Sequence, residues 1–511
     1  MIIVYHQNNK VDTIYDYKRQ QFLEVVYDDV LKEMRRLAIS YKDRILVWCQ
    51  LELKQNLNVA VIPSLFVLKN TMLSFGGKLL SHKIGYVDSS PFLNVKVSVC
   101  YPTWLMSADM GAIHTSTLVQ FESVSFTKNF SYDLTSIAKL GMPQGLLCYS
   151  EPKLVLKASA GLGKTANLLQ LFRFVKQHYS LRWTVILFLN LIWHECKFPI
   201  IPFLICLFFK RRYCHKTFAL STSDAPKKTE LPTIDVIIPT IGRPNYVHNV
   251  VKDLAQQTHL PKSIIIIEQH PDFTSTSDLD FIYSKSWPFA IKHQFIHQTG
   301  ACNARNLALK EVTAEFVYLA DDDIEFDRDL LEKVLFKMWR FNLDVVSMSC
   351  IQKDEVEQKK VPLQWPAFGA GCSILKSKLL DVVTFNMALE FGYSEDVDFG
   401  CQLRNNGVDI IYLPYIKTHH LKAPIGGFRS TFKHLWREDS ILPKPAPTVM
   451  LNSLLNKTNA QLLGYKTQLC INYYFVQKIK HPLRYYRMFL RQWDRSKYWA
   501  EHLQSSNKER K

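Results

Sequence analysis

The 11 cysteines of this sequence include no Cys-x-x-Cys pair, and no apolar run reaches the length of a membrane span. An odd number of scattered cysteines argues against a disulfide framework and a zinc site, and it indicates a reducing compartment. A helix that crosses a bilayer needs about 20 consecutive apolar residues, so a multi-span membrane protein is excluded. Residues 1–5 show no basic segment followed by a long apolar stretch, so we expect no secretory signal.

The composition is also free of any strong bias. Of the 511 residues, 47% are hydrophobic and 21% are charged, which is close to the average of globular proteins. At about 150 residues per domain, this length predicts two or three domains. The 63 Lys and Arg outnumber the 46 Asp and Glu, and the net charge of +17 predicts an anionic partner. Charge alone leaves nucleic acid, acidic lipid and a phosphorylated substrate open.

Two apolar segments lie close together before the middle of the chain. Residues 183–193 and 198–209 are strongly apolar and are followed by a basic triplet at 210–212. Each is too short to span a bilayer, so they predict either buried interdomain helices or an anchor on a membrane surface. Residues 478–495 alternate basic with aromatic side chains and predict a basic amphipathic helix. The two elements together favour a peripheral contact with an anionic membrane.

A change of composition divides the chain at residues 221–232, which are rich in Ser, Thr, Asp, Pro and Lys. Beyond it, apolar runs at 234–238, 264–267 and 315–320 predict strands, and a helical pattern follows the first. Buried strands that alternate with helices indicate a parallel sheet. Ligands of such sheets bind beyond the carboxyl ends of the strands, where this sequence places Thr240, Arg243, Glu268 and three aspartates.

The three aspartates, Asp321, Asp322 and Asp323, follow directly on the third strand. One interpretation is a solvated loop or a helix cap, because a helical pattern begins near Asp329. The other is a metal site, since adjacent carboxylates repel one another unless a cation neutralises them, and their oxygens suit Mg²⁺ or Mn²⁺. A diphosphate would complete the shell of that metal.

A second acidic cluster, Glu395, Asp396 and Asp398, opens a predicted helix that ends at Asn406-Gly407. The helix dipole favours carboxylates at a helix N-terminus, so capping explains part of this cluster. Three acids in four residues exceed what one cap needs. We therefore expect a catalytic role here.

Taken in order, these motifs resemble those of a family 2 glycosyltransferase with the GT-A nucleotide-sugar fold, over residues 232–430. The elements that carry the resemblance are Pro239-Thr240 with Arg243, Gly300-Ala301-Cys302-Asn303-Ala304-Arg305-Asn306, Asp321-Asp322-Asp323 as the Asp-x-Asp element, and Glu395-Asp396. The resemblance implies an inverting, metal-dependent transfer of a sugar from a nucleoside diphosphate sugar. The implied cofactor is Mg²⁺ or Mn²⁺.

The resemblance also implies a role for each of these residues. Asp396 is the expected base, with Glu395 as its neighbouring catalytic carboxylate, because a sugar hydroxyl is a poor nucleophile until its proton is taken. The expected metal ligands are Asp321, Asp323 and His420, although His419 could equally serve. Donor binding is expected at Pro239, Thr240, Arg243, Glu268, Arg305, Asp321 and Asp322.

The sequence lacks the Gln-x-x-Arg-Trp element and the bundle of spanning helices found in processive polysaccharide synthases of the same family. We therefore expect a single-addition transferase of cell-surface polysaccharide synthesis, with a glycan or a lipid-linked acceptor. Its expected location is cytoplasmic, peripheral on the inner face of the cell membrane. No nucleic-acid partner is expected.

The first 160 residues resemble a degenerate copy of the same fold. Residues 1–5 would form the first strand, and the stretch from Tyr101 echoes the stretch from Gln364. Ser131-Tyr132-Asp133 with Gly141 echoes Ser394-Glu395-Asp396 with Gly407. Residues 84–90, taken as the place of the acidic triplet, offer only Asp88, and one carboxylate is a poor Mg²⁺ site. We expect a non-catalytic companion; the alternatives are a second active transferase that uses Asp88 and Asp133, or an unrelated fold.

The predicted fold class is thus α/β, with a mostly parallel sheet flanked by helices, in two tandem GT-A copies of which the first is degenerate. The predicted organisation is a GT-A-like domain at 1–160, a helical apolar connector and linker at 161–231, a catalytic domain at 232–430 and a basic helical extension at 431–511.

Two alternative functions stay open at this point. Residues from Ala158 to Thr165 fit a loose phosphate-loop pattern, which would indicate a P-loop nucleotide-binding protein. Against it, the chain enters the apolar segment within about 20 residues, before any strand that could carry a metal-binding Asp. The other alternative is a non-catalytic basic protein that binds nucleic acid or membrane, and it rests only on the charge and the basic aromatic tail.

Overall fold

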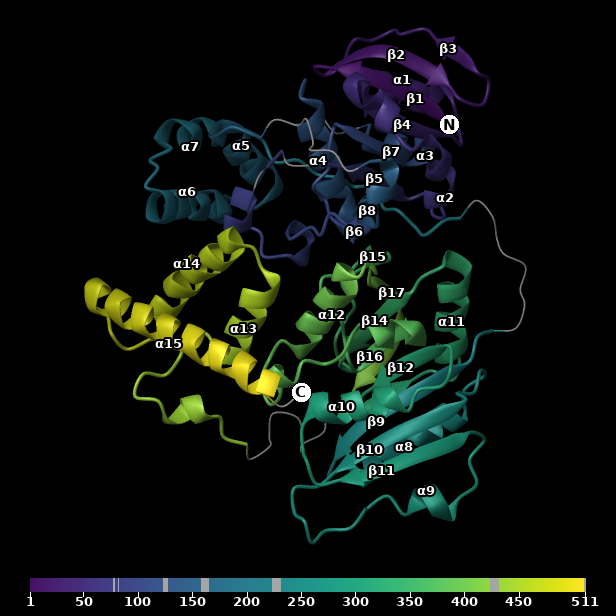
Figure 1. Cartoon of the computed structure of the whole chain (residues 1–511), viewed down its shortest axis with the longest axis vertical. Coiled ribbons are helices and arrows are strands. Elements are labelled where there is room, and N and C mark those ends of the chain that lie inside the picture. Colours follow the sequence, from purple (N-terminus) through teal and green to yellow (C-terminus); the bar gives the residue numbers. More distant parts are fainter. Residues whose placement is uncertain are drawn as a thin grey trace. The chain divides into compact units, whose positions relative to one another are not determined.

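The computed structural model describes residues 1–76, 79–80, 82–122, 127–157, 165–222, 231–422 and 432–509, with the backbone alone at 82 and 507–509. They divide into two compact units. The first unit falls within Met1–Ala225 and Lys457–Gln468, and the second within Pro226–Asn456 and Leu469–Lys511. Each is an α/β unit built on a sheet of its own (Figure 1).

The sheet of the second unit has the strand order β11-β10-β9-β12-β16-β14-β17-β13, and β15 pairs with β17. The first four strands of this order are parallel to one another, β16 runs antiparallel between β12 and β14, and β14 and β17 are again parallel. This confirms the predicted mostly parallel sheet. The strands are β9 (Ile234–Ile241), β10 (Ser263–Gln269), β11 (Ala290–Ile296), β12 (Phe316–Ala320), β13 (Ile324–Phe326), β14 (Val345–Ile351), β15 (Leu363–Gln364), β16 (Cys372–Lys376) and β17 (Ile411–His420).

Helices bury their apolar stripes against this sheet. In α8, Val247, Val250, Val251 and Leu254 recur at helical spacing and are all buried, as the sequence pattern predicts. A second apolar cluster contains Phe368, Phe385 and Phe399 together with Val317 and Leu319 of β12. The helices of the second unit are α8 (Pro244–Ala255), α9 (Phe281–Ser284), α10 (Ala301–Lys310), α11 (Leu330–Phe341), α12 (Glu395–Asn405), α13 (Pro447–Asn456) and α15 (Pro482–Glu509).

The sheet of the first unit has the order β3-β2-β1-β4-β7-β5-β8-β6. Its strands are β1 (Ile2–Gln7), β2 (Lys10–Asp16), β3 (Gln21–Leu23), β4 (Ile45–Gln50), β5 (Thr71–Phe75), β6 (Tyr101–Pro102), β7 (Met110–His114) and β8 (Leu147–Ser150). Its helices are α1 (Val30–Ser40), α2 (Ile62–Leu65), α3 (Thr115–Leu118), α4 (Phe130–Gly141), α5 (Leu168–His178), α6 (Leu181–Glu195) and α7 (Ile200–Cys206).

The two units share one topology. The path β1-β4-β7-β5-β8-β6 visits its strands in the same chain order as β9-β12-β16-β14-β17-β15. Each neighbouring pair also has the same relative direction in both units. The units differ beside the first strand, where the antiparallel strands β2 and β3 of the first unit replace the parallel strands β10 and β11. The first unit is therefore a copy of the second in its sheet topology, as predicted.

Strand register corrects the place of the acidic triplet in the first unit. Cys49 of β4 pairs with Met110, just as Ala320 of β12 pairs with Cys372. Residues 50–52 therefore correspond to Asp321–Asp323, and the prediction that residues 84–90 hold this place is wrong. The physical reason is topological: the triplet follows the strand that pairs with the first strand, and in the first unit that strand is β4.

The helix before the last long strand corrects a second correspondence. The amide of Leu146 donates to the carbonyl of Gly141, five residues back, and the amide of Val408 donates in the same way to Leu403. Gly145 and Gly407, which follow these helices, both have positive φ, at 97° and 79°. Counting back from these ends aligns Asp133 with Glu395, and Leu134 with Asp396, so the predicted match of Gly141 to Gly407 is four residues out.

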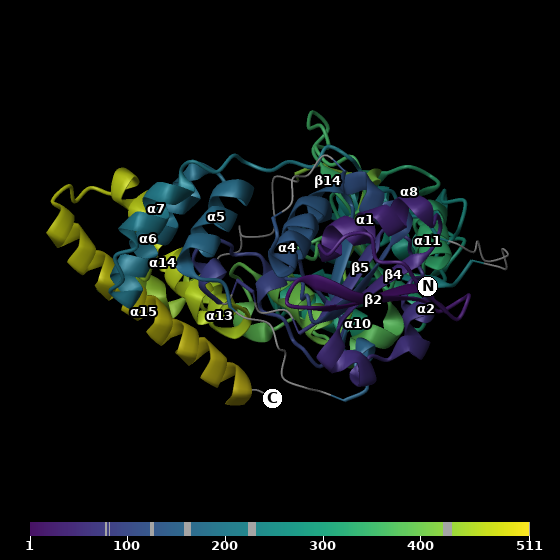
Figure 2. The same cartoon turned by 90° about the horizontal axis from the view of Figure 1, so that it is seen from above.

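Helices α5, α6 and α7 lie side by side in both views (Figures 1 and 2). Their inner faces contribute Leu171, Phe174, Leu187 and Leu191 to the core of the first unit. Residues 161–231 are therefore not a separate connector, because burial of these side chains joins the helices to the first unit. Residues 158–164 of the phosphate-loop alternative and residues 223–230 of the linker lie outside the described residues.

The C-terminal region is divided between the two units. Helix α14 (Asn459–Val476) has its first turns in the first unit and its last turns in the second, to which α13 and α15 also belong. The predicted helix over 478–495 is present as part of α15, but Tyr485, Phe489 and Trp493 are buried. Among the described helices, none combines the length and the apolar character that a bilayer crossing requires.

Candidate active site

A cavity of about 800 Å³ opens in the second unit, beyond the carboxyl ends of β9 and β12. The N-terminal turns of α10 and α12 and the chain after β17 complete its wall. All but one of the residues predicted for the site line this cavity, namely Pro239, Thr240, Arg243, Arg305, Asp321, Asp322, Asp323, Glu395, Asp396 and His420.

Asp322 binds the loop that follows β9. Its carboxylate accepts hydrogen bonds of 2.6 Å from Thr240 Oγ1 and of 2.6 Å from Arg243 Nη1. Burial raises the pKa of Asp322 to about 6, although Arg243 and Thr240 act in the opposite direction. The middle aspartate of the triplet therefore holds Thr240 and Arg243 at the cavity wall.

The two outer aspartates, Asp321 and Asp323, lie close to His420. Carboxylate oxygens of Asp321 and Asp323 and a ring nitrogen of His420 all lie within 4.8 Å of one another. His420 Nε2 is 3.3 Å from Asp323 Oδ1, and this hydrogen bond raises the pKa of His420. Successive residues of a strand point to opposite faces, so β17 directs His420 and not His419 to the aspartates. Two carboxylates and one imidazole suit Mn²⁺, and the carboxylates suit Mg²⁺.

Asp321 is fixed from two sides. Arg305 Nη2 on α10 lies 3.1 Å from Asp321 Oδ1. On the other side, a Cβ atom at Gly371 would lie 2.0 Å from Asp321 Oδ2, so the backbone approaches the carboxylate more closely than any other residue type permits. The loop before β16 thus leaves room for the carboxylate of Asp321.

Asp396 lies at the start of α12, and one of its two carboxylate oxygens accepts a hydrogen bond. Oδ2 accepts a long hydrogen bond of 3.4 Å from the amide of Ala370. Oδ1 is buried and has no hydrogen-bond partner among the described residues. Burial raises the pKa of Asp396 to about 6, while the positive charge of Arg305 opposes this shift. Burial also raises the pKa of the neighbouring Glu395. A buried carboxylate with a free oxygen and a raised pKa is suited to accept a proton.

Glu390 is a functional candidate that the sequence analysis missed. Its carboxylate accepts hydrogen bonds from the amides of Cys302 and Asn303, at 3.0 and 2.7 Å, and so caps the N-terminus of α10. Gly300 makes this possible, since its φ is +139° and a Cβ there would lie 2.4 Å from Glu390 Oε2. The sequence signal was weak, because Glu390 lies nearly 90 residues from the helix that it caps.

Glu268 is placed differently from the prediction. Its carboxylate accepts hydrogen bonds from Ser277 Oγ at 2.5 Å and from the amide of Asp278 at 3.0 Å, and it lies 2.9 Å from His293 Nε2. It is not among the described residues that line the cavity, whereas the next residue, Gln269, is. Gln269 Oε1 accepts a 2.6 Å hydrogen bond from the amide of Gly300. Glu268 thus organises the loop after β10 and does not itself reach the cavity.

Aromatic side chains form the wall of the cavity that lies towards α13. Phe391 and Phe432 stack with ring centroids 4.2 Å apart, and His434 and Trp436 stack at 3.7 Å. His434 Nε2 is bonded to the carbonyl of Phe391 at 2.9 Å, which joins the two stacked pairs. Tyr393 also lines the cavity and is exposed. His434 and Trp436 are thus two lining residues for which the sequence predicted no role.

Residues 235–397 match the family model described as Glycosyl transferase family 2. This part of the chain is therefore a family 2 glycosyltransferase domain with the GT-A fold, as its motifs predicted. The matched residues include all of the predicted site except His420. No curated protein matches the chain at a significant level.

The structure is also similar to parts of solved glycosyltransferases. S. aureus TarS is 17% identical over 46% of this chain and 42% of TarS, with a TM-score of 0.33. TarS 1–349 in complex with UDP-GlcNAc is 18% identical over 46% of this chain and 70% of that one, with a TM-score of 0.35. The mannosyltransferase PcManGT from Pyrobaculum calidifontis, in complex with GDP-Man and Mn²⁺, is 18% identical over 55% and 86% of the two chains, with a TM-score of 0.33. The chain thus spans less than half the length of TarS.

Proposed function

We propose that the second unit transfers a sugar from a nucleoside diphosphate sugar to a hydroxyl acceptor in a single inverting step that depends on a divalent metal. One observation carries the proposal. The cavity brings the cluster of Asp321, Asp323 and His420 together with Asp396, whose buried Oδ1 has no partner among the described residues. These are the groups that a leaving diphosphate and an attacking hydroxyl require.

Asp396 acts as the general base in this proposal. The acceptor hydroxyl gives its proton to Asp396 while its oxygen forms a bond to the anomeric carbon of the donor sugar. The bond from that carbon to the diphosphate breaks at the same time, and its electron pair leaves with the nucleoside diphosphate. A single displacement of this kind inverts the anomeric configuration. Glu395 neighbours the base and adds negative charge that keeps its affinity for a proton high.

Asp321, Asp323 and His420 would hold the metal, either Mg²⁺ or Mn²⁺. When bound there, a divalent cation supplies positive charge to the departing diphosphate. Arg243 and Arg305 add charge beside the same carboxylates, at 3.2 Å from Asp323 and 3.1 Å from Asp321. Donor binding is proposed for Pro239, Thr240, Arg243, Arg305, Asp321 and Asp322, which line the cavity, with Glu268 acting through the loop that it organises.

The proposed acceptor is a glycan or a lipid-linked glycan in cell-surface polysaccharide synthesis. The aromatic wall formed by Phe391, Tyr393, Phe432 and Trp436 supports a sugar acceptor, because ring faces pack well against the C–H groups of a pyranose. We propose a cytoplasmic protein in peripheral contact with the inner face of the cell membrane and no nucleic-acid partner.

For the first unit we propose a non-catalytic role. Gln50 and Glu52 stand where the second unit has Asp321 and Asp323, and Leu134 stands in place of Asp396. Gln50 Nε2 donates to Asp109 Oδ1 at 3.1 Å, and Asp109 occupies the position of Gly371. Loss of the base and of one metal carboxylate is incompatible with the proposed chemistry.

The proposal is tested by incubating the full chain with UDP-, GDP- and dTDP-sugars and Mn²⁺ or Mg²⁺, and by measuring nucleotide release. Slow hydrolysis of the matching donor is expected, and ¹H NMR of the sugar released from an α-linked donor should show the β-anomer first. Release of the α-anomer would contradict the inverting step. Absence of any release with all donors and both metals would contradict the proposed activity.

A further inference from the structure

The outer side of α7 carries an exposed apolar surface. Seven large hydrophobic side chains lie within eleven consecutive residues, and each is more than a third exposed; we call them the α7 patch: Phe198, Ile200, Ile201, Leu204, Ile205, Leu207 and Phe208. Phe208 is 88% exposed and Ile201 is 70% exposed. No charged residue occurs between 198 and 209. Continuous apolar surface of this kind marks a binding face in a folded protein.

The α7 patch is not the unpacked side of a loose hairpin. The inner face of the same helices is already buried, since Phe203 contacts Phe188 and Phe172 with ring centroids 4.8 and 6.1 Å apart. Leu187 and Leu191 of α6 are in the same core. An ordinary surface helix would present polar residues on its remaining face. Helix α7 is apolar on both faces, so its outer face needs a partner.

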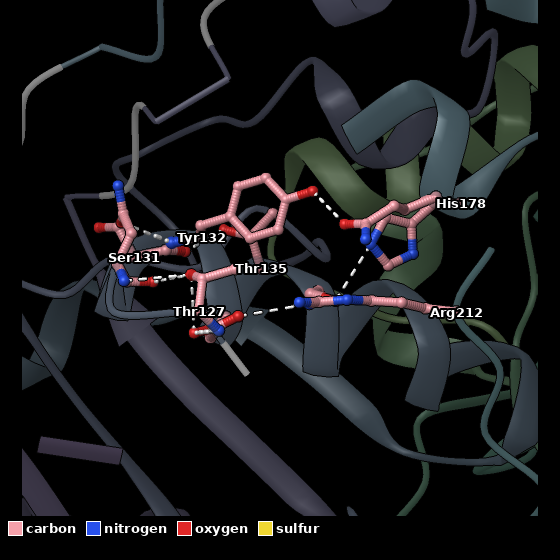
Figure 3. A network of polar contacts seen from close by, with 10 residues as sticks. Thr127, Ser131, Tyr132, Thr135, His178 and Arg212 are labelled. Carbon is pink, nitrogen blue, oxygen red and sulfur yellow. Dashed lines mark hydrogen bonds and ion pairs between the residues drawn. The ribbon is translucent and has the colours of Figure 1, made fainter. Parts of the chain in front are cut away.

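A buried polar network fastens the end of the α7 patch to the first unit (Figure 3). Arg212 points inward, where its Nη1 donates to Ser136 Oγ at 2.8 Å and lies 3.3 Å from Asp133 Oδ1. The amide of Arg212 donates to the carbonyl of Gln177 at 2.9 Å, and Tyr132 Oη donates to Gln177 Oε1 at 2.6 Å. The α7 patch is therefore held on a fixed platform and does not swing on a free linker.

The charges around the α7 patch have one sign. Residues 181–222 hold six Lys and Arg and a single acid, Glu195. Glu195 is paired with Lys197 at 2.8 Å and with Lys83, so its charge is already compensated. The basic residues whose side chains are exposed are Arg182, Lys197, Lys210, Arg211 and Lys216. Cations next to an apolar surface match the phosphate groups that border the acyl region of a bilayer.

Aromatic residues of the type found at lipid interfaces flank the α7 patch. Trp193 precedes it and Tyr213 follows it, and both are exposed. The C-terminal helix α15 offers no comparable apolar surface, because Tyr485, Phe489 and Trp493 are buried within the second unit, and its exposed large hydrophobic residues are Leu483 and Tyr498, fifteen positions apart. Helix α7 has seven residues, so it can lie in the interface but cannot cross it.

We propose that the α7 patch docks the first unit on an anionic phospholipid surface, with Ile201 and Phe208 entering the acyl boundary and Lys210 and Arg211 meeting the headgroups. The proposed function includes a peripheral contact with the membrane, and the α7 patch is the surface that we assign to it. The docking needs neither donor nor acceptor, so it stands or falls apart from sugar transfer. The first unit, whose sheet has the same topology as that of the catalytic unit, serves here as a platform and not as an enzyme.

The test is co-sedimentation of the full chain with two kinds of vesicle, phosphatidylcholine alone and phosphatidylcholine with phosphatidylglycerol. The wild-type chain should bind the anionic vesicles more tightly at low salt. Ile201→Glu with Phe208→Glu should weaken this binding by about tenfold or more, because two charges would have to enter the acyl boundary. Phe273→Glu is the matched control, since Phe273 is 82% exposed in the second unit and far from α7 in sequence. It should bind like the wild type.

A second variant separates charge from apolar insertion. Lys210→Ser with Arg211→Ser should lower binding to the anionic vesicles about tenfold and leave binding to neutral vesicles unchanged. Equal thermal melting of all variants checks that they are folded. The proposal is overturned if the wild-type chain does not bind anionic vesicles, or if the Glu variant binds as well as the wild type. It is also overturned if the wild-type chain is a dimer that the Glu variant dissociates, because a second copy then covers the α7 patch.

Discussion

Gly371 lies so close to Asp321 that a Cβ atom on it would be 2.0 Å from Asp321 Oδ2. A side chain at this position must therefore displace one carboxylate of the candidate metal cluster. The effect is local, since the backbone of Gly371 does not have a positive φ that only glycine favours. The close approach makes the position of Asp321 depend on a glycine from a different part of the chain.

The first prediction follows from this contact. Gly371→Ala should lower turnover by at least about tenfold and weaken Mn²⁺ binding measured by calorimetry, because Asp321 has to move. The melting temperature should fall by a few degrees at most, from strain at a single contact. Unchanged Mn²⁺ affinity in a folded Gly371→Ala protein would show that Asp321 is not a ligand.

Metal dependence is the second prediction. Removal of the metal with a chelator should abolish donor binding, and so should Asp323→Ala in the presence of Mn²⁺, since a cation held by Asp321, Asp323 and His420 would supply positive charge to the diphosphate of the donor. Asp354→Ala is a suitable control, because Asp354 is an exposed aspartate of the same unit. Donor titrations followed by calorimetry would distinguish the variants. If Asp323→Ala binds the donor as tightly as the wild type, Asp323 is not a metal ligand that donor binding requires.

The third prediction concerns pH. The pKa of Asp396 is raised to about 6 by burial, and a general base must be ionised, so kcat/KM should fall as the pH drops below about 6. The free energy of unfolding changes with pH in the opposite direction and rises as the pH falls through about 6. The reason is that the pKa of Asp396 is higher in the folded protein than in the unfolded chain, so folding disfavours the ionised form. Asp396→Asn should thus raise the free energy of unfolding at pH 7.5 by about 3 kcal/mol, and this gain should vanish near pH 3.5. Denaturant titrations at both pH values would measure it, and an equal effect at both would refute the assignment.

The fourth prediction concerns the buried pair of Asp133 and Arg212 in the first unit. Arg212→Met leaves Asp133 buried without its cation and should cost about 3–5 kcal/mol in unfolding free energy. Asp133→Asn in the same chain should recover part of this loss, because the uncompensated charge is removed. Sugar transfer per folded molecule should stay within about twofold of wild type in both variants. A large loss of turnover in a folded Arg212→Met protein would contradict a non-catalytic first unit.

The sequence predicted the catalytic unit well because its signals are local. A strand followed by polar residues can be recognised within ten residues, and β9 with Thr240 and β12 with Asp321 both have this form. Their meeting in one cavity then follows from the rule that carboxyl ends of parallel strands share an edge. Glu268 shows the limit of that rule, since the side chain at such an end can turn to its own loop, as it does to Ser277 and Asp278.

What the sequence left out depends on long-range contacts. Glu390 caps α10 from nearly 90 residues away, and no spacing pattern announces it. The true counterparts of Asp321 and Asp396 in the first unit are Gln50, which strand register identifies, and Leu134, which the hydrogen bonds at the helix ends identify. The basic aromatic pattern of α15 was read correctly as a helix, but its aromatic face packs against protein, as Trp493 shows. Periodicity predicts an apolar face and does not say what covers it.

The central claim is tested most directly by measuring the turnover number and the donor affinity of Asp396→Asn and of the wild type. The substitution keeps the size of the side chain but removes its ability to take a proton. The account predicts unchanged donor affinity, and a turnover number lower by about 10²- to 10⁴-fold, the usual contribution of a general base. Turnover close to wild type in Asp396→Asn, with Glu395→Gln inactive, would contradict the account and assign the base to Glu395.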